Sequence, residues 1–136
     1  MENSEIFVEE ALKNVLESVP GLTDRVCPVA DILHSEGPLA VYEQKEEAEE
    51  NAMDGLTGLA TAVFTVHVLH NTYERMRLLS EQVKRAVQTL RQSTYGSLYI
   101  EETTVKLATP DIYELRVDHF RRSYQVTIQY QIKEDK

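Results

Sequence analysis

Two histidines three residues apart, His67 and His70, form the pattern in this 136-residue chain that most suggests metal binding. They fall in an alternating stretch that predicts a strand over residues 59–70, and residues three apart on a strand point to opposite faces. A metal ion needs its ligands to converge at about 2 Å, so these two side chains could not share one. We therefore predict no metal or cofactor and interpret both histidines as solvated or edge residues.

The single cysteine, Cys27, could be a nucleophile, with His34 as its base. No orienting acid or oxyanion-hole motif accompanies them, as nucleophilic catalysis requires, so a small buried thiol is the simpler interpretation. His119 stands beside Asp118, but neighbours on a strand face apart and would not act as an acid–base pair. The residues therefore predict a protein that is not an enzyme.

A run of acidic residues is the densest group of charges in the sequence. It consists of Glu46, Glu47, Glu49, Glu50 and, slightly later, Asp54. A calcium loop needs alternating ligands and a glycine at its bend, and that pattern is absent. Contiguous glutamates are typical of a solvated segment, and they could also present a charged surface to a partner.

The net charge of -9 is unevenly distributed along the chain. Residues 1–54 hold 14 acidic and 3 basic residues, whereas residues 55–136 hold 9 acidic and 11 basic residues. Nucleic acids and anionic membranes are gripped by basic surfaces, so both are disfavoured as general partners. One cysteine cannot form an intrachain disulfide, and neither a long apolar span nor a secretory signal is recognisable, so we expect a cytosolic protein.

The spacing of apolar residues predicts two amphipathic helices, over residues 4–19 and 72–91. Asn71 is the expected N-cap of the second helix, because Glu74 follows it three residues later in a pattern like a capping box. The outer face of this helix is basic, through Arg75, Arg77, Lys84, Arg85 and Arg91. That face is the second candidate for a charged contact surface.

Alternation of apolar and polar residues predicts four strands, over residues 39–44, 59–70, 98–107 and 124–133. A polar loop is expected over residues 45–55, a bulge near Glu102 and Thr103, and a turn at residues 109–111. The order α-β-β-α-β-β with short connections favours antiparallel pairing, with both helices on one face. We therefore expect an α+β two-layer sandwich with a mainly antiparallel four-stranded sheet, in a single domain over residues 1–136.

This arrangement resembles the tail-completion proteins of long-tailed bacteriophages and prophages, the small head–tail joining or tail-terminator proteins. The resemblance covers roughly residues 5–133 and rests on the order and lengths of the elements. Its strongest pieces are a strand, ATAVFTVHVLHNT, that runs directly into a helix, YERMRLLSEQVKRAV, and the final alternating strand RRSYQVTIQYQI.

The resemblance implies a structural protein of the virion that forms a ring, commonly of six subunits, on the end of the tail tube. Its partners would be further copies of itself, the tail-tube protein and a head-completion or neck protein, with assembly in the host cytoplasm. DNA would pass through the ring without specific binding, and no membrane, cofactor or catalysis is implied. A closed ring needs two different complementary surfaces, so we hypothesise that the acidic run meets the basic helix face between subunits.

The sequence is also compatible with two other classes of function. The chain could be another neck, head-closure or minor tail protein, for which the same α+β pattern would serve. It could also be a non-viral cytosolic domain that binds a small ligand or regulates a partner, and a pocket with convergent polar side chains would favour that alternative.

Overall fold

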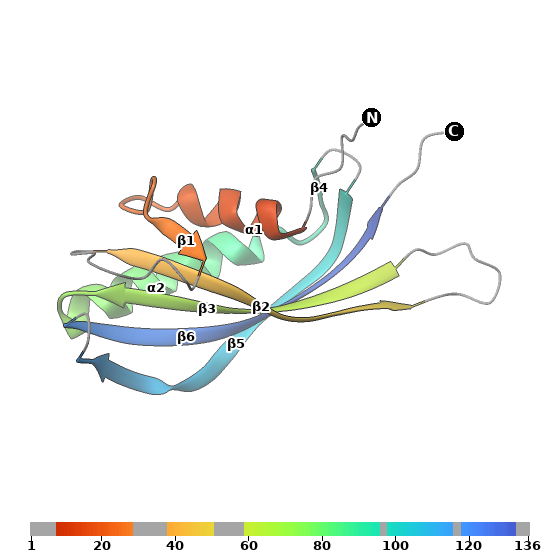
Figure 1. The fold of residues 1–136 in the computed structure, drawn as a ribbon. Helices are drawn as coiled ribbons and strands as arrows, with labels where there is room; N and C mark the ends of the chain where they lie inside the picture. Colours follow the sequence, from red (N-terminus) through yellow and green to blue (C-terminus); the bar gives the residue numbers. More distant parts are fainter. Residues whose placement is uncertain (1–7, 29–37, 51–58, 96–97, 116–117, 133–136) are drawn as a thin grey trace.

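A computed structural model describes residues 8–28, 38–50, 59–95, 98–115 and 118–132 (Figure 1). Two helices and six strands follow one another along the chain. They are α1 (Val8–Glu17), β1 (Val26–Pro28), β2 (Leu39–Glu50), β3 (Leu59–His70), α2 (Tyr73–Gln88), β4 (Ser93–Tyr95), β5 (Leu98–Glu114) and β6 (His119–Ile132).

All six strands belong to one curled sheet, in the order β1-β2-β3-β6-β5-β4. The strands from β2 to β6 pair in antiparallel fashion, whereas β1 lies parallel to β2. The predicted four-stranded sheet with the order α-β-β-α-β-β is therefore wrong. The two extra strands, β1 and β4, are three residues long, which is too short for alternation to be visible in the sequence.

Strand β2 extends through Glu50, although the sequence predicted a polar loop from residue 45. Beyond a register shift between Gln44 and Glu46, the chain stays paired with β3, so that Glu46 faces Val63 and Glu50 faces Leu59. Glutamate has low strand propensity, but pairing with a neighbouring strand routinely outweighs such preferences.

Strand β5 also runs through the turn that was predicted at residues 109–111. Register shifts between Leu107 and Thr109 and between Thr109 and Ile112 accommodate Pro110 without ending the strand. Proline is tolerated there because it lies at an edge and next to a bulge. The bulge expected near Glu102 is present as a shift between Ile100 and Glu102, and β6 begins at His119, five residues earlier than predicted.

The core lies between the sheet and the two helices, which both cover the same face (Figure 1). Alternate residues of β3 and β6 point into the core, and the apolar faces of α1 and α2 pack against them. Fully buried members include Leu12, Leu16, Ala62, Phe64, Val66, Val87, Val126 and Ile128. This packing orients α2 so that its other face, with most of the basic residues, is turned to solvent.

Helix α2 is capped by Thr72 rather than by Asn71. Thr72 is extended, with φ −122° and ψ 155°, and its Oγ1 accepts a hydrogen bond from the Arg75 N–H at 3.2 Å. Asn71 lies one residue too early, and its own N–H donates to His70 Nδ1 at 2.8 Å.

Candidate functional site

The acidic run lies on the second half of β2, where Glu46, Glu47, Glu49 and Glu50 all belong to the strand. β1 pairs only with residues 40–42 of β2, so no described strand covers the outer edge of β2 beyond Tyr42. Asp54, the last member of the predicted acidic set, lies outside the described residues. The run is therefore part of a strand that pairs with β3 rather than of a loop.

The structure keeps the predicted basic residues close to α2: Arg75, Arg77, Lys84, Arg85 and, just after the helix, Arg91. Two of them already have partners, because Arg77 Nη2 lies 3.4 Å from Glu74 Oε2 and Arg91 Nε lies 2.6 Å from Glu102 Oε1. Both pairs are largely exposed and contribute little to stability. Among the described side chains, no carboxylate lies within ion-pair distance of the other three.

The end of β2 and the start of α2 lie at opposite ends of the sheet (Figure 1). Glu50 pairs with Leu59, and β3 must then rise about 35 Å before α2 begins. Arg75 and Arg77 in the first turns of α2 are thus remote from the acidic end in their own chain. A contact between these two charged regions would need a second copy.

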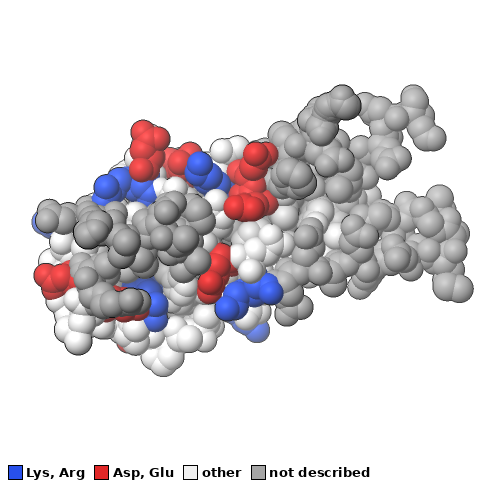
Figure 2. Space-filling view, in the orientation of Figure 1, with Lys and Arg blue, Asp and Glu red and all other residues white. Residues whose placement is uncertain are grey.

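Figure 2 shows acidic and basic side chains intermingled over the described part of one face of the molecule. The visible described surface has no broad region of a single sign. It therefore offers no basic stripe of the kind that grips a nucleic-acid backbone.

His67 lies on the sheet face opposite the helices, within a cluster of polar side chains. Its Nδ1 is 2.7 Å from Ser123 Oγ on β6, and its Nε2 is 4.0 Å from Glu43 Oε2 on β2. Burial lowers the pKa of His67, and the positive charge of Arg121 lowers it further, so the ring is neutral at pH 7. These contacts link three strands of the sheet.

Serine, histidine and glutamate in contact resemble a catalytic triad by residue type. Ser123, however, is only 2% exposed, so its hydroxyl cannot reach a substrate. Sequence reasoning placed His67 at a solvated or edge position and missed this cluster. Its partner Ser123 is 56 residues away along the sequence, and no local sequence pattern predicts that β3 pairs with β6.

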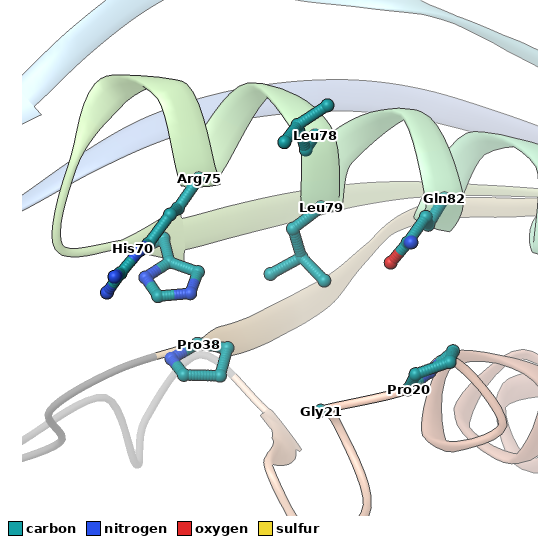
Figure 3. A pocket seen from close by; sticks show the side chains of 8 residues that line it. All are labelled: Pro20, Gly21, Pro38, His70, Arg75, Leu78, Leu79 and Gln82. Carbon is teal, nitrogen blue, oxygen red and sulfur yellow. The ribbon is translucent and has the colours of Figure 1, made fainter.

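His70 lies on the helix-covered side of β3 and borders a cavity of about 220 Å³ (Figure 3). The cavity forms where the turn after α1, the start of β2 and the first turns of α2 meet. Its lining residues are Pro20, Gly21, Pro38, His70, Arg75, Leu78, Leu79 and Gln82. Gly21 has a φ of 94°, which residues with side chains rarely adopt, so glycine is required in this wall.

His70 and Arg75 offer hydrogen-bond donors to this cavity, whereas the Gln82 amide offers a donor and an acceptor. His70 Nδ1 accepts the Asn71 N–H, so the neutral ring carries its proton on Nε2. Burial lowers the pKa of His70, and the neighbouring charge of Arg75 lowers it further. The full positive charge at the cavity is therefore that of Arg75.

Strand β5 and the residue that follows it present most of the exposed large apolar side chains among the described residues. Six such side chains are exposed, and four of them, Leu107, Ile112, Tyr113 and Leu115, fall within residues 107–115. β4 pairs only with residues 98–100 of β5, so no described strand covers the outer edge from residue 101 onward. Sequence reasoning predicted a turn at residues 109–111 and left residues 113–118 unassigned, and so missed this surface.

The remaining candidate residues do not converge on a site. Cys27 belongs to β1, in register with Val41, and its proposed base His34 lies outside the described residues. His119 is buried, whereas Asp118 is exposed in the turn before β6 with a φ of 57°. Within the described residues, no group of three or more His, Cys, Asp and Glu is placed to hold a metal ion.

Comparison with known proteins does not place the chain in a family. No protein-family model matches the sequence, and a search of curated proteins gives no significant match. In the part of the chain that the structure describes, no helix combines the length and apolarity needed to cross a membrane. Function must therefore be argued from the surfaces described above.

Proposed function

We propose that this protein is a structural virion-assembly protein of a long-tailed phage or prophage. In this role it completes or terminates the tail tube and joins it to the head, as a ring of identical subunits at the tail–head junction. The observation that carries the proposal is the open edge of β5, where exposed apolar side chains lie along a stretch that no described strand covers.

An unpaired strand edge offers backbone donors and acceptors to another chain, and exposed apolar side chains gain from being covered. Residues 102–107 of β5 pair with β6 in regular register, whereas the shifts around Thr109 and the ring of Pro110 interrupt regular pairing beyond them. A partner strand could therefore add along a short stretch only. Such a limit favours a defined contact over open-ended aggregation.

The charge distribution supports a head-to-tail contact. The acidic end of β2 and the basic start of α2 lie at opposite ends of the sheet (Figure 1). The acidic end of one copy could therefore contact the α2 helix of the next copy, and the same contact could be repeated from copy to copy around a ring. Heterologous contacts of this kind close into rings when the rotation permits. Complementary charge would steer that encounter and make it sensitive to salt.

The test uses purified tail tubes and the purified protein. Electron microscopy should show a cap at one end of the tube and an arrest of further polymerisation by the tail-tube protein. Leu107→Lys should abolish capping, because Leu107 is 59% exposed on the open edge of β5. Leu78→Lys is the matched control, since Leu78 is 55% exposed on α2 and away from that edge.

Two results would count against the proposal. If the wild-type protein leaves tail tubes uncapped, the tail-completion role is wrong. If Leu107→Lys caps as well as wild type while Leu78→Lys does not, the contact surface is on α2 and the open edge of β5 does not explain assembly.

The charge contact has a separate test. Reversing charge in the double variant Arg77→Glu/Arg85→Glu should weaken assembly in sedimentation and reduce its dependence on salt. Unchanged sedimentation would remove the proposed pairing of the acidic run with the basic helix face, while leaving the role of β5 intact.

A further inference from the structure

We propose that the cavity beside His70 is a docking site for a segment of a partner polypeptide that carries a glutamate or aspartate next to an aliphatic side chain. The inference does not depend on the tail-completion role, although Arg75 belongs both to this cavity and to the basic helix face proposed to contact a neighbouring copy. It follows from the donors at the cavity rim, the apolar wall and the rigidity of the frame.

The polar groups of the cavity select a carboxylate. Arg75 and the His70 Nε2–H offer donors at one end of the cavity, and the Gln82 amide at the other end offers a donor and an acceptor (Figure 3). None of the described residues that line the cavity is acidic. Among the described side chains, none neutralises the Arg75 guanidinium. An anion placed beside Arg75 and His70 would accept from both, and charged hydrogen bonds of this kind are stronger than neutral ones.

The apolar wall selects an aliphatic side chain. Pro20, Pro38 and Leu79 contribute carbon surface to the cavity, which is an open hollow of about 220 Å³ rather than the enclosed cleft typical of small-molecule sites. Leu78 continues this apolar surface outward and is strongly exposed. The ligand therefore has one side chain in the cavity and a body that extends over the surface, as a polypeptide has.

The frame of the cavity is held in place before any ligand binds. Arg25 Nε donates to the carbonyl of Pro38 at 3.0 Å, and the Ala40 N–H donates to the carbonyl of Arg25 at 3.1 Å. These bonds tie the segment after α1 to the start of β2. Pro20 and Pro38, whose φ angles are fixed, add to this frame, so little conformational entropy is lost on binding.

The test is a titration of the ¹⁵N-labelled full chain, followed by two-dimensional NMR. The probe is the peptide acetyl-Ala-Leu-Glu-Ala-amide, and its matched control has Gln in place of Glu. We expect saturable shifts of the Gly21 and Leu79 amides, with the Glu peptide binding about fivefold tighter than the Gln peptide. Arg75→Gln should abolish that preference, whereas Arg85→Gln, a basic-to-neutral change elsewhere on α2, should keep it.

Each outcome decides part of the proposal. No saturable shift at these two amides, or equal binding of the two peptides, overturns it. Equal or tighter binding of N-acetyl-L-leucine would assign the site to a small carboxylate instead of a polypeptide. If the same amides shift with protein concentration in the absence of peptide, the cavity binds a second copy of this chain, and the proposal of a different partner polypeptide is overturned. Both arginines are exposed, and unchanged spectra outside the cavity confirm that the variants fold.

Discussion

Asp111 and Arg122 form a two-bonded ion pair that fastens the irregular end of β5 to β6. Arg122 Nε and Nη2 donate to Asp111 Oδ1 and Oδ2 at 3.0 and 2.9 Å, and the Tyr73 hydroxyl donates to Oδ2 at 3.1 Å. Only 13% of the Arg122 side chain and 23% of the Asp111 side chain are exposed. The pair thus joins both strands to the start of α2, close to the register shifts of β5 around Pro110.

Removing this guanidinium should destabilise the fold. Arg122→Met keeps the aliphatic stem but leaves the Asp111 carboxylate without its charged partner, and we expect a loss of about 1–3 kcal/mol. Urea unfolding would measure it. The matched control is Arg91→Met, which breaks an exposed pair with Glu102 and should cost under about 1 kcal/mol. Equal losses in the two variants would show that the partly buried pair contributes no more than the exposed one.

The same pair should make stability depend on pH in the acid range. Hydrogen bonds from Arg122, and secondarily from Tyr73, hold the pKa of Asp111 below its ordinary value of 3.8. The unfolded chain therefore takes up this proton first, so the stabilisation is complete above about pH 4 and is lost as the pH falls through the lower pKa of the folded state.

Asp111→Asn tests this sign. Wild type should exceed the variant in unfolding free energy by about 1–2 kcal/mol at pH 6, and the gap should narrow at pH 3. Glu102→Gln controls for general titration of carboxylates, since Glu102 is exposed in its pair with Arg91. A gap that is the same at both pH values would contradict the assignment.

The first turn of α2 distinguishes the structure from the sequence-based prediction. Because Thr72 Oγ1 caps the helix, Thr72→Ala should cost about 0.5–2 kcal/mol. Asn71→Ala should be nearly neutral, as its side chain caps nothing in the described structure. Thermal unfolding of the two alanine variants would compare them directly, and the reverse order of stabilities would restore Asn71 as the cap.

His67 should make stability fall below neutral pH. Burial, followed by the charge of Arg121, lowers the pKa of His67 below its ordinary value of 6.5. The folded state favours the neutral ring, so its contribution is complete above pH 6.5 and declines as the pH falls below that value.

His67→Gln should therefore reduce the loss of stability between pH 7.5 and pH 5.5, measured by urea unfolding at each pH. A residual slope is expected, because burial and Arg75 also lower the pKa of His70. The double variant His67→Gln/His70→Gln should show a still smaller change of unfolding free energy with pH. A slope in the single variant equal to that of wild type would mean that His67 titrates alike in both states.

Sequence patterns located the long elements because those elements bury one face. The alternation in β3 and β6 and the helical stripes of α1 and α2 each reflect a division between core and solvent that periodicity reveals. Phe64 and Val126, for example, both fell on the predicted inward faces and are fully buried. Strand pairing, by contrast, extended β2 across Glu46 and Glu50 and β5 across Pro110, against the local preferences of those residues.

The sequence by itself determined the composition of this protein's surfaces: an acidic N-terminal part, a basic second helix and no recognisable catalytic motif. Only the tertiary structure decided which residues meet. Ser123 is hydrogen-bonded to His67, Asp111 pairs with Arg122, and Pro20 and Pro38 line the same cavity as Arg75. The reason is physical: local periodicity reports which face of an element is buried, whereas contacts between distant segments depend on strand order and register, which no short stretch of sequence encodes.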